Sequence, residues 1–188
     1  MSAPIVAISG HPGGGKTTLT KALARRLGVL ALHYDDFETM TSRPPGEVRD
    51  WIARGSDYDE IGLEPMIERL RGLAQAAPRP RLVLLDTLLG RAHRDSGRLI
   101  DLLIWIDTPA DIALARKIDE AAGRAAPAEA SQFVGWLRSY LDHYQGFIAA
   151  TYELQRERVR PGADVILDGR LAAEALAEQA MSAIVARM

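Results

Sequence analysis

Short apolar runs alternate along this chain with segments in which apolar residues recur at helical spacing. The apolar runs are predicted to be buried strands, at residues 5–9, 30–34, 82–86, 100–106 and 164–167. The segments with helical spacing are predicted to be helices, at residues 18–27, 63–77, 109–122, 132–158 and 172–187. Because strands that alternate with helices form a parallel sheet covered on both faces, we predict an α/β fold, a three-layer, doubly wound parallel sheet of about five strands.

Turn and capping residues mark the ends of several predicted elements. Gly28 follows the first helix, where a left-handed residue commonly ends a helix. Thr108, Pro109 and Asp111 have the order of an N-cap, a first helical residue and the acid of a capping box. Residues 39–59 are rich in proline and glycine, so we predict a largely irregular excursion there.

Composition narrows the class of protein. The 188 residues suffice for one domain, and the hydrophobic fraction of 47% and charged fraction of 26% are those of an ordinary globular protein. The net charge of −2 provides no basic face for nucleic acid, and the lack of cysteine excludes disulfides and thiolate metal sites. The first residues lack the charge and the apolar length of a signal or membrane anchor. We therefore expect a soluble, cytoplasmic protein that binds neither nucleic acid nor membrane.

The residues from Gly10 to Thr18 match the phosphate-loop pattern G-x-x-x-x-G-K-[ST]. They lie between a predicted strand and a predicted helix, as a phosphate cradle requires, whereas a glycine-rich hairpin with an accidental lysine would not need these flanks. In such a loop Lys16 reaches the β- and γ-phosphates of ATP, and the Thr17 hydroxyl binds Mg²⁺. We predict a nucleotide site made by Gly10, Gly13, Gly14, Gly15, Lys16, Thr17 and Thr18.

Three aspartates follow predicted strands at the edge where α/β sheets bind ligands. Asp35 and Asp36 end the second strand, and either carboxylate could accept a proton from a substrate hydroxyl or form only a turn or helix cap. Asp86 ends the third strand, beside the phosphate loop, and is the candidate carboxylate for Mg²⁺. A strand-end cap is the alternative for Asp86.

Two further segments are candidates for contact with substrate and phosphates. Arg116 and Arg124 belong to a basic, alanine-rich segment within residues 116–131, which we predict to be a small lid that neutralises charge on the transferred group. A solvated helix face is the alternative. Residues 39–61 are predicted to be a substrate-side insertion, in which Trp51 could form a wall of the site.

Arg91 follows the third strand and could face the substrate, with a solvated loop charge as the alternative. Two patterns typical of guanine-nucleotide switches are missing. The chain has no Asn-Lys-x-Asp string, and the run from Asp86 to Gly90 is one residue longer than Asp-x-x-Gly. A motor acting on macromolecules would need more chain and a basic track. The small size therefore favours a phosphotransferase that acts on a small molecule.

These segments together resemble the uridine kinase and nicotinamide riboside kinase group of P-loop kinases, which is related to phosphoribulokinase and pantothenate kinase. Residues 8–18 resemble that family's phosphate loop, and residues 33–37 its Gln-Asp-Asp/Ser-Phe segment. Residues 107–111 and 114–118 resemble the strand and helix that lead into its lid, and residues 163–167 its closing strand. Asp86-Thr87 stands where the family commonly has Glu-Gly.

The resemblance implies a P-loop NTPase fold over residues 1–188 and Asp35 as the catalytic base. It implies an enzyme that uses ATP and Mg²⁺ to phosphorylate a hydroxyl of a small metabolite, either nucleoside-like or sugar-like. In this scheme Asp36, Trp51 and Arg91 contact the substrate. A nucleotide-binding regulatory protein with little phosphoryl transfer is the alternative, motivated by Asp86-Thr87 and by a lid with few arginines. A homodimer is the default assembly for such an enzyme.

Overall fold

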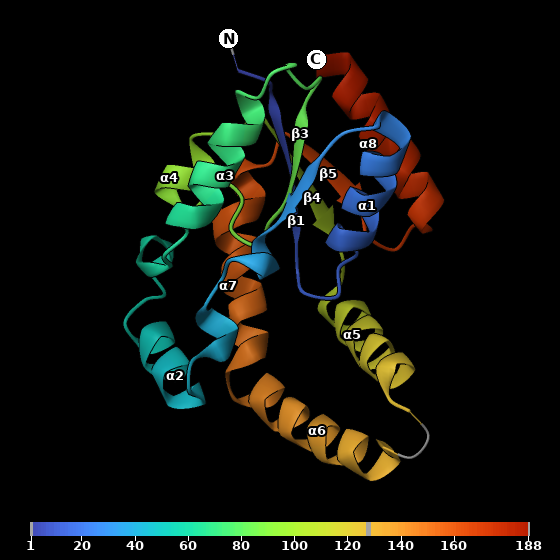
Figure 1. Ribbon diagram of the computed structural model, residues 1–188. Coiled ribbons are helices and arrows are strands. Elements are labelled where there is room, and N and C mark those ends of the chain that lie inside the picture. Colours follow the sequence, from blue (N-terminus) through green and yellow to red (C-terminus); the bar gives the residue numbers. More distant parts are fainter. Residues whose placement is uncertain (1, 127–128, 188) are drawn as a thin grey trace.

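The computed structural model describes residues 2–126 and 129–187 and contains a five-stranded parallel sheet (Figure 1). The strands lie in the order β2-β3-β1-β4-β5, so β1 is central, between β3 and β4. The predicted α/β fold and its strands are confirmed, with boundaries shifted by one or two residues. The strands are β1 Ile5–Gly10, β2 Ala31–His33, β3 Val83–Asp86, β4 Leu102–Asp107 and β5 Val165–Asp168.

Helices cover both faces of the sheet, as Figure 1 shows. None of them, within the ranges that the structure describes, is long and apolar enough to cross a membrane. A π-helical segment, Tyr144–Ile148, joins α6 to α7 without a break. The helices are α1 Lys16–Leu27, α2 Pro45–Ala53, α3 Glu64–Ala74, α4 Arg94–Gly97, α5 Ala110–Arg124, α6 Ala130–His143, α7 Ala149–Val159 and α8 Ala173–Arg187.

Two hydrophobic clusters, one on each face, hold the layers together. Successive side chains of a strand point to opposite faces, so Val6 and Ile8 join the cluster under α1 and α8, whereas Ile5 and Ala7 join the cluster that includes α3. All six residues of β1 are buried. Burying a side chain such as Ile8 contributes roughly 1.5–3 kcal/mol. This two-sided burial fixes the central strand, and with it the start of the phosphate loop.

Helices α5 and α6 form an arm that extends beyond the carboxyl edge of the sheet (Figure 1). Helix α6 has no buried residue, whereas α7 buries Tyr152, Gln155 and Val159 against the body of the protein. The predicted helix over residues 132–158 is therefore confirmed as one continuous helical rod, half of it in the arm. Pro127, within the predicted lid region, lies outside the described residues.

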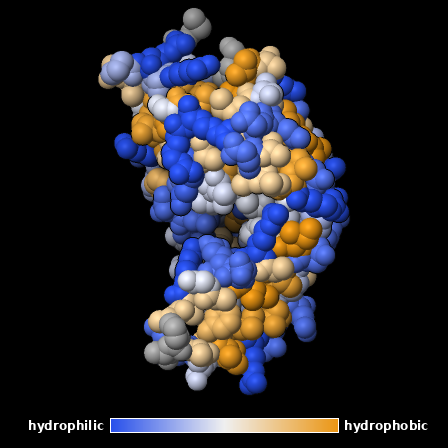
Figure 2. Space-filling model, turned by 90° about the vertical axis from the view of Figure 1, so that its right-hand side faces the viewer, coloured by the Kyte–Doolittle hydropathy of each residue, from blue (hydrophilic) through white to orange (hydrophobic). Residues whose placement is uncertain are grey.

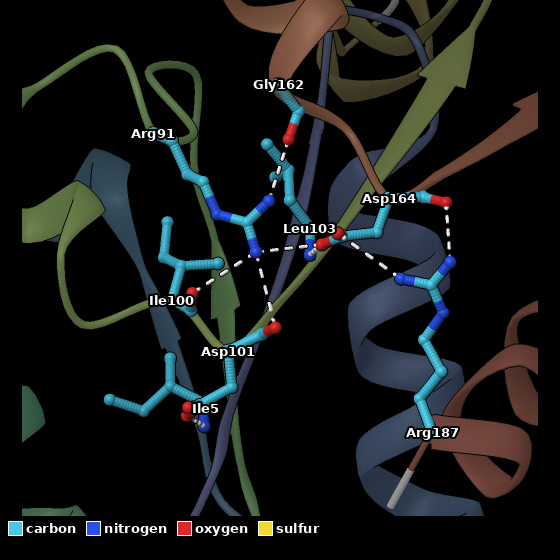
Figure 3. Close-up of polar contacts among 8 residues, drawn as sticks. All are labelled: Ile5, Arg91, Ile100, Asp101, Leu103, Gly162, Asp164 and Arg187. Carbon is cyan, nitrogen blue, oxygen red and sulfur yellow. Dashed lines mark hydrogen bonds and ion pairs between the residues drawn. The ribbon is translucent and has the colours of Figure 1, made fainter.

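The amino edge of the sheet is held by a closed network of charged groups, drawn in Figure 3. The Arg91 guanidinium donates hydrogen bonds to the carbonyl oxygens of Gly162, Ile100 and Asp101. It also forms a 2.8 Å ion pair with Asp164, whose carboxylate accepts from the Leu103 backbone N–H at 2.8 Å. These contacts join the amino ends of β4 and β5.

Further bonds extend this network to the central strand and to the last helix. The Asp101 carboxylate accepts from the Ile5 backbone N–H at 2.8 Å, at the start of β1, and Arg187 of α8 pairs with Asp164. Burial would raise the pKa of Asp164, but the Leu103 amide, Arg91 and Arg187 together hold it below its usual range. The carboxylate of Asp164 is therefore stabilised in its charged form.

The structure corrects two local predictions. The prediction that residues 39–59 are largely irregular is wrong, because Pro45–Ala53 forms α2, with proline at a first-turn position where a missing N–H costs nothing. The predicted capping box at Thr108 is also wrong. Helix α5 begins at Ala110 with no side-chain cap, and the Thr108 hydroxyl instead donates to the Gly14 carbonyl oxygen at 3.0 Å. Thr108 thus supports the phosphate loop.

Candidate active site

The phosphate loop ends in a helix terminus whose backbone donors have no side-chain cap. Helix α1 begins at Lys16, and Gly15 precedes it in the left-handed region at φ 96°. A Cβ on Gly13 would lie 2.2 Å from the Ala113 carbonyl oxygen, so only glycine fits where the loop passes α5. The unpaired N–H groups and the helix dipole together favour an anion at this position.

Lys16 supplies a buried positive charge at the same position. Its side chain is 8% exposed, and its ammonium donates a 3.0 Å hydrogen bond to the His11 carbonyl oxygen. Burial lowers the pKa of Lys16, whereas the negative charges of Asp86 and Asp35 act to raise it. An ammonium has three donors, so Lys16 can donate to a bound phosphate and keep its hydrogen bond to the His11 carbonyl oxygen.

Thr17 and Asp86 provide oxygen atoms that fit a magnesium ion. The Thr17 hydroxyl donates to the Asp86 carboxylate at 2.6 Å, so the loop and the end of β3 meet here. Magnesium in phosphate-transfer sites is usually held by one or two protein oxygens together with phosphates and waters, which agrees with this pair. Residues 2–126 and 129–187 contain no group of three or more His, Asp or Glu side chains that could hold a metal.

His33 is a neighbour of Asp86 that the sequence interpretation missed. His33 and Asp86 are paired at the ends of the adjacent strands β2 and β3, and His33 Nδ1 lies 3.1 Å from the Asp86 carboxylate. His33 therefore helps to orient the carboxylate that also accepts from Thr17. The strand order would have revealed this pair, but the spacing in the sequence alone does not.

Asp35 lies in a single 3₁₀ turn directly after β2, at the carboxyl edge of the sheet. Partial burial raises the pKa of the Asp35 carboxyl. The positive charge of Lys16 opposes this rise, and the negative charges of Asp86 and Glu38 add to it. Asp35, Lys16 and Asp86 therefore lie close enough to influence one another electrostatically. Asp35 and Asp36 are both exposed in this turn.

The lid residues on α5 differ in their surroundings. Arg116 is half-buried, and it forms no hydrogen bond or ion pair with another described residue. Lys117 lowers the pKa of both Lys16 and Asp35 through its positive charge, so its ammonium acts on the site, although the predicted site did not include it. Arg124 is 74% exposed and pairs with Glu120. The effect of Lys117 depends on how α5 lies beside the phosphate loop, which spacing in the sequence does not reveal.

A groove of about 720 Å³ runs between α5 and α6, next to these charges. Figure 2 shows hydrophobic residues gathered on this arm, below a hollow that separates it from the body. Phe133, Trp136 and Tyr140 stack along α6, with ring centroids 5.8 and 5.1 Å apart. The groove is lined by Lys117, Glu120, Ala121, Arg124, Ala125, Glu129, Gln132, Phe133, Trp136 and Tyr140.

Two predicted substrate residues lie outside this site. Arg91 is engaged at the amino edge of the sheet, where its donors are used by the network of Figure 3, so its prediction as a substrate residue is wrong. Trp51 is only 6% exposed, and its indole donates to the Asp57 carbonyl oxygen while its ring stacks on Tyr58. Trp51 is therefore a core residue of the insertion and not a wall of the site.

Comparisons with known proteins give a consistent class. No family model matches the chain. The chain is 28% identical over 176 residues to cytidylate kinase from Halobacterium salinarum, covering 87% of this chain and 85% of that protein. It is 30% identical over 124 residues to shikimate kinase from Corynebacterium glutamicum, covering 64% of this chain and 68% of that protein. A solved structure of a possible uridine kinase from Bacillus stearothermophilus matches with a TM-score of 0.56 at 14% identity, covering 89% of this chain and 90% of that one.

The chain therefore belongs to the P-loop small-molecule kinases and has their fold, with the strand order 2-3-1-4-5. The enzyme is a small-molecule phosphotransferase. The resemblance to the uridine kinase group is one among several, because the curated relatives divide between cytidylate and shikimate kinases.

Proposed function

We propose that this enzyme transfers the γ-phosphoryl group of ATP, with Mg²⁺, to a hydroxyl of a small nucleoside-like or sugar-like metabolite. The proposal rests on one juxtaposition at the carboxyl edge of the sheet. There a buried lysine in an uncapped helix terminus, a hydroxyl–carboxylate pair and an aspartate with a raised pKa lie close enough to interact electrostatically. Phosphoryl transfer requires these groups, because it depends on positioning and on charge neutralisation more than on covalent catalysis.

The nucleotide would be held by the loop glycines, Lys16 and the first turn of α1. The backbone N–H groups from Gly13 to Lys16 would bind phosphate oxygens, with Gly10 and Thr18 at the two ends of the cradle. Lys16 would neutralise charge on the β- and γ-phosphates. Thr17 and Asp86 would hold Mg²⁺, which would supply positive charge to neutralise the phosphates.

Asp35 is proposed as the base that orients the acceptor hydroxyl. As the acceptor oxygen attacks the γ-phosphorus, the bond from that phosphorus to the β–γ bridging oxygen of ATP breaks. ADP leaves, and the hydroxyl proton passes to the Asp35 carboxylate. A raised pKa brings the carboxyl nearer to the pH at which it must accept and then release this proton. Asp36, exposed beside it, is proposed to contact the acceptor.

The arm formed by α5 and α6 is proposed to close over the phosphates. Two cations of α5 are proposed to act on the phosphates. Arg116 is half-buried and unpaired among the described residues, and Lys117 acts electrostatically on Lys16. Lys117 and Arg124 both pair with Glu120. Arg124 is farther along α5 and 74% exposed, so its contribution is expected to be smaller. Closure of such an arm excludes water and completes the set of charges around the transferred group.

The proposal is tested by measuring ADP release from Mg·ATP against a panel of nucleosides, sugars and vitamin precursors. Lys16→Ala provides the blank, and Lys21→Ala, on the exposed face of the same helix, controls for removal of a lysine. One acceptor that raises ADP release well above background hydrolysis supports the proposal and identifies the substrate class. A flat panel with Mg·ATP still tightly bound supports the alternative, a nucleotide-binding regulatory protein.

A further inference from the structure

Gln155 of α7 has a buried side-chain amide. Its hydrogen-bonding groups face the residues at the carboxyl ends of β1 and β3. Its side chain is 5% exposed, although the helix before it leads out into the arm. Its Nε2 donates to the carbonyl oxygens of Gly10 at 3.1 Å and Leu88 at 2.6 Å. Two carbonyl oxygens require the NH₂ group, so the Oε1 atom faces the ring of His11, at 3.1 Å from Nδ1.

This arrangement determines the tautomer of His11, the second residue of the phosphate loop. An amide oxygen can only accept, so His11 Nδ1 carries the proton and donates to Gln155. The ring is 2% exposed, lies parallel to Tyr152 at 4.9 Å and meets Trp105 edge-on at 5.4 Å. Burial lowers the pKa of His11, the hydrogen bond that His11 donates to Gln155 acts to raise it, and the charge of Lys16 lowers it further. His11 is thus a neutral ring in a fixed orientation.

The atoms joined by Gln155 belong to the two halves of the proposed nucleotide site. Gly10 ends β1 and begins the phosphate loop, and Leu88 lies two residues after Asp86. The His11 carbonyl oxygen accepts from both the Lys16 ammonium at 3.0 Å and the Gly14 backbone N–H at 2.8 Å. A shift of His11 would therefore move the acceptor that positions Lys16 and the turn that shapes the loop.

We propose that Gln155 is a positioning residue of the nucleotide site, which holds the phosphate loop in register with the strand end that carries Asp86. It touches neither nucleotide nor acceptor, and it acts through His11, Gly10 and Leu88. The inference rests on the proposed function only in that this site binds nucleotide phosphates. It adds that α7, which continues into the arm, also supports the loop from behind. The Tyr152 hydroxyl donates to the Pro12 carbonyl oxygen at 3.2 Å, which is a second contact of α7 with the loop.

The test compares Gln155→Leu with Val159→Ala, a substitution one turn further along α7. Val159 is buried, and its apolar side chain cannot form a hydrogen bond, so its truncation destabilises the same helix without removing any of the polar contacts that Gln155 makes. Titration calorimetry with Mg·ADP gives the nucleotide affinity, and a thermal scan gives Tm. We expect Gln155→Leu to weaken Mg·ADP about tenfold, the factor that corresponds to one net hydrogen bond. Val159→Ala should lower Tm and leave the affinity unchanged.

A second variant, His11→Phe, keeps the parallel ring contact with Tyr152 but removes the donor to Gln155. It should weaken Mg·ADP by about threefold, and the double variant should be no weaker than Gln155→Leu alone, because both act through one contact. The variant also serves if Gln155→Leu does not fold. Unchanged Mg·ADP affinity in the folded variants would overturn the positioning role. Failure of the wild-type protein to bind Mg·ADP would instead overturn the proposed function itself.

Discussion

The two edges of the sheet use the same kinds of charged side chain in opposite ways. At the amino edge, Arg91 donates to carbonyl oxygens and pairs with Asp164, so both groups are used within the protein. At the carboxyl edge, Lys16 has a single carbonyl partner, and Arg116 pairs with no described residue. The pKa values diverge as well, because Asp164 is held below its usual range and Asp35 is raised above it.

This difference indicates which edge evolved for ligands. Charges that pair with one another have no capacity left for a substrate, and removal of one partner leaves the other uncompensated. Charges that are buried but incompletely paired cost stability, and a bound polyanion such as a nucleotide phosphate would relieve that cost. The comparison therefore predicts that substitutions at the carboxyl edge change catalysis more than stability, and that substitutions at the amino edge do the reverse.

Lys16→Ala is expected to have the largest effect on turnover. Loss of its charge should lower acceptor-stimulated ADP release at least about a thousandfold, since it removes the neutralisation of the transferred group. The Tm should not fall, because the variant also removes a buried charge whose pKa is lowered by desolvation. Lys21→Ala on the same helix should keep wild-type turnover. Loss of turnover in both variants would remove the special role of Lys16.

Asp35→Asn is expected to lower kcat by about a hundredfold to a thousandfold, the range typical of removing a general base. The KM for ATP should change little, because Asp35 is proposed to contact the acceptor and not the nucleotide. Asp36→Asn, by contrast, should mainly raise the KM for the acceptor. Steady-state kinetics with each substrate varied in turn make the distinction. Equal losses of kcat and of ATP affinity in Asp35→Asn would indicate a structural role.

The same variant has a pH-dependent effect on stability. A carboxyl with a raised folded-state pKa contributes stability that is fully present below its unfolded pKa, about 3.9, and is lost as the pH rises through the folded value. Asp35→Asn should therefore have a higher Tm than wild type at pH 7, and this advantage should disappear near pH 4. Thermal scans between pH 4 and 8 measure it. A lower Tm at pH 7 would contradict the raised pKa.

Arg91→Ala at the amino edge should lower stability and spare catalysis. It leaves the Asp164 carboxylate and three carbonyl oxygens with fewer donors, at a cost of about 1–3 kcal/mol. For a chain of this size the Tm should fall by about 2–4 °C per kcal/mol. The kcat, measured well below that Tm, should match wild type. Arg98→Ala, whose exposed guanidinium lies 4.0 Å from Asp95, is the matched control and should change neither value.

Acid should weaken the stabilisation that the Asp164 carboxylate gives to the amino edge of the sheet. The pKa of Asp164 is lowered, so its stabilisation is present above the unfolded pKa of about 3.9 and is lost as the pH falls through the folded value. The difference in Tm between wild type and Asp164→Asn should be constant above about pH 5 and shrink below about pH 4. A difference that grows toward low pH would show that the network does not depend on the charged carboxylate.

Arg124→Ala should have the smallest effect. The side chain is 74% exposed and its pair with Glu120 is screened by water, so the free energy of unfolding should change by less than about 0.5 kcal/mol. If the arm closes as proposed, kcat should fall by no more than about threefold, which is less than for Arg116→Ala. A larger loss from Arg124→Ala than from Arg116→Ala would reverse the proposed order of the lid residues.

The sequence predicted what local pattern determines. Five strands, the phosphate loop and the left-handed Gly28 after α1 follow from short-range rules, and the structure has them where they were expected. Helix α2 was missed because proline and glycine usually interrupt helices, whereas here Pro45 occupies a first-turn position. The error at Thr108 arose because its hydroxyl bonds to Gly14, a partner 94 residues away.

The candidate site also contains residues that a local pattern predicts and residues that only the tertiary fold brings together. Lys16 and Thr17 belong to a contiguous motif, so the sequence could place them together. Arg91 was misplaced because the chain after β3 runs back toward the amino edge of the sheet, which charge and position alone do not reveal. His33, Lys117 and Gln155 were missed because their contacts depend on strand order and helix placement.

The most direct test of the account is transfer of the labelled γ-phosphoryl group of ATP to the acceptor that the panel identifies. It should be measured side by side in wild type, Asp35→Asn and Arg91→Ala at a temperature where all three are folded. The account predicts labelled product from wild type and Arg91→Ala at similar rates, and a loss of at least about a hundredfold in Asp35→Asn. Equal rates in wild type and Asp35→Asn, or a loss confined to Arg91→Ala, would contradict the assignment of catalysis to the carboxyl edge.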